Sequence, residues 1–491
     1  MTNSIEDVCE QAQVIVLVGS NPEEAHPVMG MRIRRAVERG AKLIVVDPRD
    51  IGLASKADIH LKLRPGTNVA FANGMVNAII AQGLVDKGFV ANRTEGFDEL
   101  AAMVADYTPE KVAEICGIDA RDLMQAAALY AKADRAPIIY CLGVAEHSTG
   151  TEGVMSLSNI AMVCGKFGKP GCGVNPLRGQ NNVQGACDMG AGPADFTGYQ
   201  KVADPDALAK FEAAWGVRMN RTPGLKATEC FPAMIEGRIK GLFIFGEDPI
   251  RTDPDTHHVI RALESLEFLV VEELFMTETA KYADVILPGR SYAEKEGTFT
   301  NTERRVQRVR KAVDGPAGPR LDTEVFAEIM RRMGYDQPSL SAAQIMDEIA
   351  SLTPSYAGIS HARLDGAQVA GRGIQWPCPS ADHPGTPIMH VEQFSRGKGT
   401  YSLAQYRPSA ELPDAEYPLV LMTGRVLAQY NACAMTGRTE GLNEISGESF
   451  IELNTVDAEQ LGVVDGDRVR VASRRGEIET TARVSGKTNP G

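Results

Sequence analysis

One stretch of the chain gathers side chains that bind ligands instead of building a core. Residues 178–190 read RGQNNVQGACDMG, which is four amides, one arginine and one aspartate among three glycines. This run predicts neither a helix face nor an alternating strand. Amide groups donate and accept hydrogen bonds, glycine lets a backbone approach a ligand closely, and the cation of Arg178 suits a small anion or a polyanionic cofactor. The alternative is a polar surface loop.

The composition is that of a globular protein of several domains. The chain has 491 residues, 43% hydrophobic and 23% charged, and this length predicts roughly three domains. The formal net charge of −13 argues against nucleic acid as a partner, although it allows an anionic ligand in a local basic pocket. The apolar runs reach only the length of a strand, which predicts no membrane span.

The nine cysteines are scattered, and no two of them form a C-x-x-C pair. Such a set predicts reduced thiols in a cytoplasmic protein. The spacing supports neither a zinc site nor an iron–sulfur cluster held within this chain, so we assign no residue as a metal ligand. The first residues, MTNSIED, lack the basic region of a signal peptide.

Two segments of the chain repeat one pattern about 227 residues apart. Each begins with an apolar strand, at residues 14–18 and 241–245, that runs into a glycine, two polar residues and a proline. A second apolar strand follows and ends on an acid, Asp47 in the first segment and Glu272 in the second. The shared offsets indicate a duplicated unit. The alternative is that both are generic strand–helix–strand segments.

The strands of these two segments predict where a ligand would bind. Near-continuous apolar strands separated by helices predict a parallel sheet that is covered on both faces, and ligands bind such sheets outside the carboxyl ends of the strands. An acid at that edge accepts hydrogen bonds from ribose hydroxyls or from a guanine edge. Neither segment has G-x-G-x-x-G, so an ordinary nicotinamide fingerprint is absent. The residues at the predicted binding edges are Gly19, Ser20, Asn21, Asp47, Pro48, Arg49, Gly246, Glu247, Asp248 and Glu272.

Other segments predict further elements. We expect helices at residues 27–39, 68–82, 120–133, 156–167 and 257–263, and a strand at 137–144. The charged segment 294–307 is either a solvated excursion or a contact surface for another domain. Residues 354–415, rich in proline, glycine and histidine, are expected to form a connector. After it, strands at 419–422, 467–472 and 478–484 predict an all-β tail, which we expect to form a small barrel.

Together these pieces resemble the large subunit of molybdenum- or tungsten-dependent formate dehydrogenases, in the molybdopterin oxidoreductase superfamily. The most specific match is the amide run with the leucine before it, residues 177–190. Supporting matches lie at residues 19–22, 246–249, 283–288, 294–298 and 423–430. The resemblance extends over essentially the whole chain.

The resemblance implies a fold and a cofactor. The fold is α/β, with two related Rossmann-like parallel-sheet domains and a truncated C-terminal β-barrel of the double-psi type. We expect the first dinucleotide-cofactor domain at residues 1–180, the second at 181–395 with an excursion near 293–321, and an incomplete barrel at 396–491. Such enzymes hold two molybdopterin guanine dinucleotides with molybdenum or tungsten, which accords with the repeat.

Functional roles follow from the resemblance at matching positions. Arg178 resembles the arginine that orients the carboxylate of formate by paired hydrogen bonds, and Gln180 would lie close to the metal centre. One dinucleotide would be lined by Gly19, Asn21, Asp47, Arg49, Gly66, Asn68, Gly143 and Glu146. The other would be lined by Gly246, Asp248, Thr252, Glu272 and Asp322. From the barrel, Arg425, Gln429 and Tyr430 would contact pterin, with Gln429 standing where such enzymes often carry histidine. Ser20, Pro48, Gly179 and Glu247 complete the cofactor-binding set.

The implied reaction is the oxidation of formate to carbon dioxide, with two electrons passing to the metal. The expected partners are formate and electron-transfer subunits with iron–sulfur or flavin groups, and residues 423–439 favour an NAD-linked acceptor over ferredoxin or quinone. We expect no nucleic acid and no membrane span. One alternative is another molybdopterin oxidoreductase, such as a nitrate reductase. A second alternative is a non-catalytic module that binds the cofactor.

Two family features are absent from this sequence. Members of the family begin with a four-cysteine domain that holds a [4Fe–4S] cluster, and they carry a metal-ligating cysteine or selenocysteine followed by histidine. No Cys-His pair occurs in this chain. Members also continue beyond the position of Gly491. We therefore expect an internal fragment of the subunit that is inactive alone, with the cluster only in the missing N-terminal region.

Overall fold

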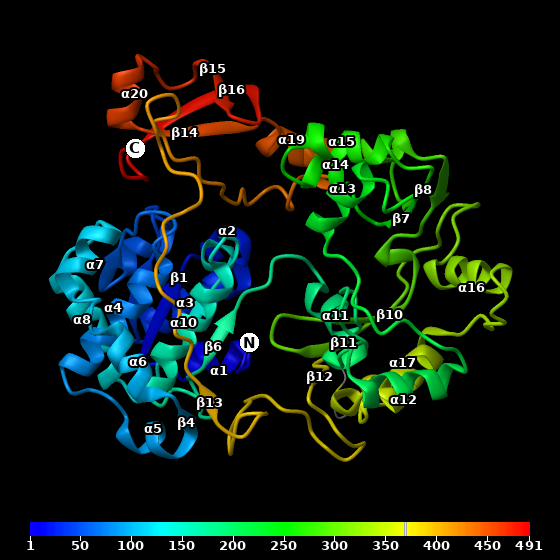
Figure 1. Ribbon diagram of the computed structural model, residues 1–491, viewed down its shortest axis with the longest axis horizontal. Helices are drawn as coiled ribbons and strands as arrows, with labels where there is room; N and C mark the ends of the chain where they lie inside the picture. The colour runs from blue at the N-terminus through cyan, green and yellow to red at the C-terminus, as the bar shows by residue number, and fades with distance from the viewer. Residues whose placement is uncertain (368, 370) are drawn as a thin grey trace. The chain divides into compact units, whose positions relative to one another are not determined.

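The computed structural model describes residues 1–367, 369 and 371–491, and the chain divides into two compact units. The first unit consists of Met1–Gly179, Pro387–Tyr430 and Thr439–Gly491. The second consists of Gln180–Thr386 and Asn431–Arg438. Figure 1 labels the helices and strands of both.

A five-stranded parallel sheet forms the centre of the first unit, with its strands in the order β3-β2-β1-β5-β6. The strands are β1 (Val14–Val18), β2 (Lys42–Val46), β3 (Ile59–Leu61), β5 (Ile138–Tyr140) and β6 (Val174–Pro176). Every residue of β1 is buried. Valine, isoleucine and leucine fill this strand because a central parallel strand faces helices on both sides.

Helices cover both faces of this sheet (Figure 1). On one face, α1 (Ile5–Glu10) and α3 (Pro27–Glu38) pack against Ile15 and Leu17. The other face supports the larger core. Its helices are α4 (Asn68–Ala81), α6 (Phe97–Val104), α7 (Pro109–Cys116), α8 (Ala120–Lys132) and α10 (Gly150–Val163). The predicted parallel sheet with two covered faces is confirmed here, as are the helices predicted at 27–39, 68–82 and 120–133.

Two predicted elements of the first unit have different bounds. The strand predicted at 137–144 ends at Tyr140, because the chain turns at Cys141 into the short helix α9 (Leu142–Ala145). The helix predicted at 156–167 is α10, which begins and ends earlier. It stops at Val163 because Gly165 adopts a left-handed φ of +61°.

Part of the predicted connector is built into the first unit. Strand β13 (Gly399–Thr400) pairs in parallel with β4 (Thr94–Glu95). Beyond β13, Asn73 Nδ2 donates to the carbonyl oxygen of Ala404 at 2.9 Å, and Asn159 Nδ2 donates to that of Ser402 at 2.8 Å. These buried amides therefore fix a segment that the sequence alone indicates as loose.

The second unit contains a three-stranded parallel sheet in the order β7-β8-β9. The strands are β7 (Gly241–Phe245), β8 (Phe268–Glu273) and β9 (Val285–Pro288). Helices α13 (Ala227–Ile235) and α15 (Thr256–Glu264) pack on one face, and α15 confirms the helix predicted at 257–263. On the other face, the ring of Phe326 from α16 (Asp322–Arg332) meets Phe243 and Phe245 edge-on.

An antiparallel sheet forms the second core of this unit. Its strands are β10 (Gly297–Thr300), β11 (Arg305–Val309) and β12 (Ile374–Gln375), and the surrounding helices include α12 (Pro205–Trp215), α17 (Ala342–Leu352) and α18 (His361–Asp365). The charged segment predicted as an excursion or contact surface is therefore a hairpin, β10–β11. Val306 is buried within it against Tyr356, because its side chain lies on the inner face of the alternating strand.

The amide run also contains regular structure. Residues Val183–Asp188 form helix α11, which the sequence pattern does not predict. The helix follows Asn182, whose left-handed φ of +62° starts the turn. Its inner face carries Gln184 and Asp188, so it lacks the apolar periodicity on which a helix prediction depends.

The C-terminal segment holds a three-stranded sheet in the order β14-β16-β15. Its elements are α19 (Glu440–Ser446), β14 (Phe450–Asn454), α20 (Thr455–Leu461), β15 (Arg468–Ser473) and β16 (Gly476–Ser485). Strands β15 and β16 confirm the two strands predicted last. The strand predicted at 419–422 is wrong: Val420 N donates to the carbonyl oxygen of Gly491 at 3.0 Å, but residues 419–422 are not in a strand ladder. Closure into a barrel stays a prediction.

The two repeated segments share their element order and their hydrogen bonds. Asp58 accepts from the backbone N–H of Leu43 at 2.9 Å and donates its own N–H to the Leu43 carbonyl at 2.8 Å. Asp284 makes the same pair of bonds with Leu269, at 2.7 Å and 2.9 Å. In both segments the aspartate fixes the start of the second strand, which supports a duplicated unit.

The register of the repeat corrects one predicted match. Gly19 N donates to the carbonyl oxygen of Val46 at 2.8 Å, and Gly246 N donates to that of Glu272 at 2.9 Å. Glu272 is therefore the counterpart of Val46, and the acid that corresponds to Asp47 is Glu273. Asp47, which follows β2, and Glu272, which lies within β8, therefore do not occupy equivalent positions in the two repeats.

Candidate functional site

Two glycines meet at the carboxyl edge of the first sheet. Gly19 follows β1 with a φ of +53°, and Gly143 lies just beyond β5. Gly143 N donates to the carbonyl oxygen of Gly19 at 3.1 Å. A Cβ added to Gly19 would lie 2.6 Å from the carbonyl carbon of Gly143, so the two turns pack backbone against backbone. The structure therefore brings these two predicted residues together and leaves no room for a side chain between them.

Asp47 and Arg49 follow β2 at the same edge. The buried carboxylate of Asp47 accepts from the backbone N–H of Arg49 at 3.0 Å. Burial raises the pKa of Asp47, and the bond from Arg49 with its nearby charge opposes that rise. His60 Nε2 donates to the backbone carbonyl oxygen of Asp47 at 3.1 Å. The loop after β2 is thus fixed by its own hydrogen bonds, with a guanidinium and a carboxylate beside each other.

The carbonyl oxygen of Gly143 accepts hydrogen bonds from two side chains. It accepts from Asn68 Nδ2 at 3.0 Å and from His147 Nε2 at 3.0 Å. Asn68 is the first residue of α4, so the bond joins that helix to the edge. Glu146 is exposed. A Cβ added to Gly66 would lie 2.4 Å from Ser409 Oγ, which places Gly66 against the later segment of its unit.

Arg178 follows the last strand of the sheet. The backbone N–H of Leu177 donates to the carbonyl oxygen of Tyr140 at 2.8 Å, which extends the pairing of β5 and β6 by one step. Arg178 comes next and is half-buried. Its own carbonyl oxygen accepts from His26 Nε2 at 2.6 Å. His26 is not among the predicted residues, although it contacts the peptide of the residue predicted to bind substrate.

The predicted barrel residues have partners within the first unit. Gln429 Nε2 donates to the carbonyl oxygen of Ser446 at 2.8 Å. A Cβ added to Gly424 would lie 2.1 Å from Arg49 Nη1, and one added to Gly179 would lie 3.8 Å from Arg425 Nη2. Residues 424–425 thus lie at the same sheet edge. Tyr430 is exposed.

In the second unit, the amide run is anchored at Asn182. Asn182 Oδ1 accepts from the backbone N–H of Thr300, in β10, at 2.9 Å. Gln180 is exposed, and its carbonyl oxygen accepts from Val183 N at 3.3 Å. The exposed amide of Gln180 therefore lies two residues before Asn182, which is held by its hydrogen bond from Thr300.

A second anchor of the same run is Asp188, which sequence reasoning missed. Its side chain is 0% exposed and accepts four hydrogen bonds. The donors are Gln184 Nε2 at 2.7 Å, Tyr199 OH at 2.7 Å, Tyr356 OH at 2.6 Å and Trp376 Nε1 at 2.6 Å. Three of them come from outside α11, so one carboxylate ties this helix to three other segments.

The buried Arg304 lies beside this cluster. Its guanidinium lies 5.5 Å from the centre of the Trp376 ring and donates to the carbonyl oxygen of Thr386 at 2.9 Å. Burial lowers the pKa of Arg304 to about 10, while the charges of Glu303 and Asp188 oppose that change. Arg304 thus remains charged at neutral pH and balances the buried Asp188.

In the predicted loop after β7, the side chains of Glu247 and Asp248 accept hydrogen bonds from residues of the same unit. Asp248 is buried and accepts from Thr279 N at 3.0 Å and from Thr279 Oγ1 at 2.7 Å. Glu247 Oε1 accepts from Thr252 Oγ1 at 2.8 Å. Gly246 has a φ of +62° and no atom within 4 Å of an added Cβ. This edge is more open than its counterpart at Gly19.

The buried Glu272 and the half-buried Asp322 form an acidic pair beside Lys295. Glu272 is 1% exposed, and neither of its carboxylate oxygens has a hydrogen-bond donor in the described part of the chain. Burial and, after it, the charge of Asp322 together raise the pKa of Glu272 to about 7. Lys295 Nζ forms an ion pair with Asp322. The structure thus brings together two of the predicted residues, and the carboxylate of Glu272 is available to accept hydrogen bonds from a ligand.

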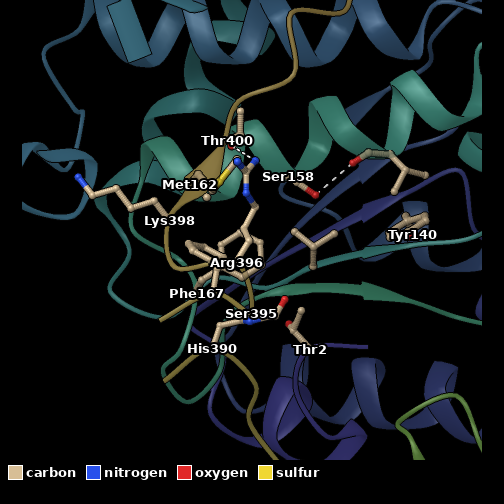
Figure 2. Close-up of a pocket in the computed structure, with 14 residues that line it drawn as sticks. Thr2, Tyr140, Ser158, Met162, Phe167, His390, Ser395, Arg396, Lys398 and Thr400 are labelled. Atoms are coloured by element: carbon tan, nitrogen blue, oxygen red, sulfur yellow. Dashed lines mark hydrogen bonds between the residues drawn. The ribbon is translucent and has the colours of Figure 1, made fainter. Parts of the chain in front are cut away.

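A cavity of about 390 Å³ lies elsewhere in the first unit (Figure 2). Phe167, Phe394 and Met162 form its apolar wall, and Arg396 stands beside them. Arg396 pairs with Glu95 at 3.1 Å. No residue predicted to bind substrate or cofactor lines this cavity, so we do not assign it to the site.

Two family models match the chain. The molybdopterin oxidoreductase model matches residues 1–332, and the molybdopterin dinucleotide binding domain matches residues 419–491. The chain belongs to the molybdopterin oxidoreductase family. The predicted family and the predicted oxidoreductase class are confirmed.

Relatives of this molybdopterin oxidoreductase include formate dehydrogenase alpha subunits. The F420-dependent formate dehydrogenase 2 subunit alpha of Methanococcus maripaludis is 48% identical, over 99% of this chain and 71% of the relative. The F420-dependent formate dehydrogenase subunit alpha of Methanocaldococcus jannaschii is also 48% identical, with the same coverage. Formate dehydrogenase H of Escherichia coli is 41% identical, over 100% of this chain and 69% of the relative.

A solved structure supports the fold. Acetylene hydratase from Pelobacter acetylenicus superposes with a TM-score of 0.75 at 22% identity, over 100% of this chain and 70% of that one. At this identity the likeness speaks for the fold alone. It supports the mixed α/β architecture with parallel sheets.

The edge of the first sheet fits the polar cofactor that this family binds. Three predicted residues carry buried polar atoms that have no hydrogen-bond partner among the described residues: Ser20 Oγ, Asn21 Oδ1 and Arg49 Nε. Buried polar groups are nearly always paired. Unpaired donors and acceptors gathered at one sheet edge therefore indicate a ligand with complementary groups, such as the phosphates and hydroxyls of a dinucleotide.

The described residues of this molybdopterin oxidoreductase contain no group of three or more histidine, cysteine, aspartate or glutamate side chains that would hold a metal ion. Its nine cysteines are all free thiols. None of the helices in the described ranges combines the length and the apolar run that a bilayer crossing needs.

Proposed function

We propose that the enzyme that contains this chain oxidises formate to carbon dioxide, and that Arg178 binds the carboxylate of the substrate. The names of the three relatives above support the substrate. The observation that carries the proposal is the position of Arg178, half-buried at the carboxyl edge of a parallel sheet where neighbouring polar atoms lack partners. Ligands bind open α/β sheets at this edge.

The chemistry assigns a simple task to Arg178. Formate becomes carbon dioxide when it releases two electrons and one proton. A guanidinium donates two parallel hydrogen bonds to a carboxylate, so it fixes both the position of the anion and the direction of its C–H bond. When bound, the metal–pterin group supplies the two-electron redox chemistry. Gln180 contributes an exposed amide for orientation.

We further propose that the chain contacts two molybdopterin guanine dinucleotides, one at each repeated unit, in Rossmann-like domains with the predicted boundaries. The first contacts the edge defined by Gly19, Asn21, Arg49 and Gly143. The second contacts Gly246, Thr252 and the Glu272–Asp322 pair, in which the carboxylate oxygens of Glu272 suit the N–H groups of a guanine edge. The C-terminal segment completes a double-psi barrel. Molybdenum is the proposed metal, with tungsten as the alternative, and a [4Fe–4S] cluster would be held by residues outside this chain.

The proposed electron acceptor differs from the one expected from sequence. Two relatives are named F420-dependent, and the NAD-linked acceptor has no support in these names. We propose that electrons pass to an F420-type acceptor through a second subunit, because the relatives are named as alpha subunits. The cytoplasm is the proposed compartment.

The experiment compares formate kinetics of the holoenzyme that contains this chain with those of Arg178→Ala. Loss of a charged, paired hydrogen bond raises the KM for formate by roughly 10- to 100-fold. Arg178→Lys recovers part of the loss because a point charge replaces the planar fork. Arg396→Ala, at the separate cavity, is the matched control and leaves KM unchanged.

An unchanged KM in Arg178→Ala removes the residue from its proposed role. A substrate panel with formate and nitrate separates formate oxidation from reduction of an oxyanion. Calorimetric titration of the chain with GDP tests the dinucleotide edge independently of turnover. Binding of GDP without turnover on any substrate would support the alternative of a non-catalytic cofactor-binding module.

A further inference from the structure

His26 lies where two short elements of the first unit meet. It ends α2 (Pro22–Ala25) and precedes the first residue of α3. Its backbone N–H donates to the carbonyl oxygen of Pro22 at 2.9 Å and its carbonyl oxygen accepts from Gly30 N at 3.0 Å, but its side chain makes no capping hydrogen bond to α3. Helix termini commonly use the side chain at this position to satisfy free N–H groups. The imidazole is therefore available for another purpose.

One ring nitrogen of His26 is hydrogen-bonded to the backbone of Arg178. Nε2 lies 2.6 Å from the carbonyl oxygen of Arg178. A carbonyl oxygen only accepts, so Nε2 carries the proton. Burial lowers the pKa of His26, and the nearby charge of Arg425 lowers it further, against the hydrogen bond to Arg178. The ring is therefore neutral at pH 7, and its other nitrogen is a bare acceptor.

That second nitrogen, Nδ1, is buried and has no hydrogen-bond partner among the described residues. It shares this property with Ser20 Oγ, Asn21 Oδ1 and Arg49 Nε, which belong to the loops after β1 and β2. His26 lies five residues beyond Asn21 in the same β1–α3 connection. At this sheet edge, three predicted cofactor residues carry a buried polar atom without a partner, and His26 is a fourth residue with this property that the sequence did not reveal.

We propose that His26 is a positioning residue for Arg178 and links it to the ligand at the sheet edge. Nε2–H holds the peptide that carries the guanidinium, and Nδ1 accepts a hydrogen bond from an N–H or O–H group of the bound cofactor. Occupation of the edge then orders the imidazole, and the imidazole orders the peptide of Arg178. The inference rests on the proposed function, because it assumes that Arg178 binds formate.

The first test measures which ring nitrogen of His26 carries the proton in the folded chain. The chain has eight histidines, and loss of one set of signals in His26→Phe assigns His26 in a ¹⁵N spectrum of the imidazoles. At pH 7 the expected spectrum shows a protonated Nε2 and an unprotonated Nδ1. A protonated Nδ1 with a bare Nε2 overturns the proposal, because such a ring cannot donate to Arg178. This readout needs neither metal nor turnover.

The second test uses formate kinetics of the holoenzyme that contains the chain. His26→Phe keeps the ring volume and removes both nitrogens, so the KM for formate rises roughly 3- to 10-fold while kcat changes less than 2-fold. His26→Gln supplies one donor and one acceptor and recovers most of the loss. His257→Phe, on the exposed start of α15 in the second unit, is the matched control and leaves both constants unchanged.

A double-mutant cycle separates this inference from the proposed function. If His26 acts through Arg178, His26→Phe has no further effect on KM in an Arg178→Ala background. An unchanged KM in His26→Phe beside a raised KM in Arg178→Ala overturns the inference alone. An unchanged KM in Arg178→Ala overturns the proposed function. Should His26→Phe fail to fold, His26→Gln assigns the ¹⁵N signals and the tautomer decides.

Discussion

The hydroxyl of Tyr356 donates to Oδ2 of Asp188 at 2.6 Å. This bond joins the amide run, through its helix α11, to a residue 168 positions later in the chain. Tyr199, Trp376 and Gln184 complete the set of donors on the same carboxylate. The buried carboxylate of Asp188 therefore anchors the amide run, whereas most helices are anchored by apolar contacts.

Asp188→Ala should destabilise the second unit more than loss of any one of its donors. The substitution removes the acceptor that four donors share and one of the two nearby carboxylates whose charges favour the buried Arg304, which costs about 3–5 kcal/mol. Tyr356→Phe removes one bond and costs about 1–2 kcal/mol. Both tryptophans lie in this unit, so urea unfolding followed by intrinsic fluorescence measures both variants. The exposed Asp314→Asn serves as control, and equal costs for Asp188→Ala and Tyr356→Phe would contradict the anchor.

Gly19→Ala and Gly246→Ala are a matched pair from the two repeats. Both residues have left-handed φ values, which add about 1–2 kcal/mol for any residue with a Cβ. At Gly19 the new Cβ also meets the backbone of Gly143, whereas at Gly246 it meets nothing within 4 Å. We therefore expect Gly19→Ala to lower the unfolding temperature by at least twice as much as Gly246→Ala. Calorimetry of the two variants checks this, and similar shifts would be evidence against the close packing of the two turns.

Ser20→Ala should separate stability from binding. Ser20 is 3% exposed, and its hydroxyl has no partner among the described residues. Removing an unsatisfied buried hydroxyl stabilises the unliganded fold by about 1 kcal/mol. The same change removes a hydrogen-bonding group from the proposed cofactor edge, so the Kd for GDP rises. Thermal unfolding and calorimetric titration measure the two effects, and a variant that is both less stable and equally able to bind GDP would contradict the assignment.

Glu272 should make the second unit more stable in mild acid than in mild base. Its pKa rises from 4.5 to about 7 on folding, chiefly through burial. The folded chain therefore holds this proton more tightly than the unfolded chain does. The resulting stability is present below pH 4.5 and is lost as the pH rises through 7. Glu272→Gln removes this contribution, so the difference in unfolding temperature between pH 5 and pH 8 becomes smaller. An unchanged difference would show that Glu272 does not titrate in this range.

The strands of both repeats are predictable from sequence because their cause is local. Val14–Val18 is apolar throughout, since a central parallel strand has no solvent face. Gly19 marks the end of β1, and Gly246 marks the end of β7. Element type follows directly from such runs. Register does not: Asp47 and Glu272 look equivalent by distance from their glycines, but the hydrogen bonds of Val46 and Glu272 show a different alignment.

The parts of the site that escaped prediction depend on distant partners. Asp188 lies in a polar run, and its donors Tyr199, Tyr356 and Trp376 are ordinary aromatic residues until the fold brings them together. His26 precedes a proline at the start of a helix, a position that reads as a cap. Its bond to Arg178 joins residues 152 positions apart. No local pattern encodes either contact.

The first unit is assembled from three separate stretches of chain, with the segment around Ala404 bonded to the buried Asn73. A ribosome must therefore complete the long insertion before the residues that finish this core become available. Folding of the sheet and its closure by the late segment are thus distinct events during synthesis. For the same reason, a protease that cuts only between residues 190 and 340 yields two polypeptides that remain together in native buffer and separate only in denaturant.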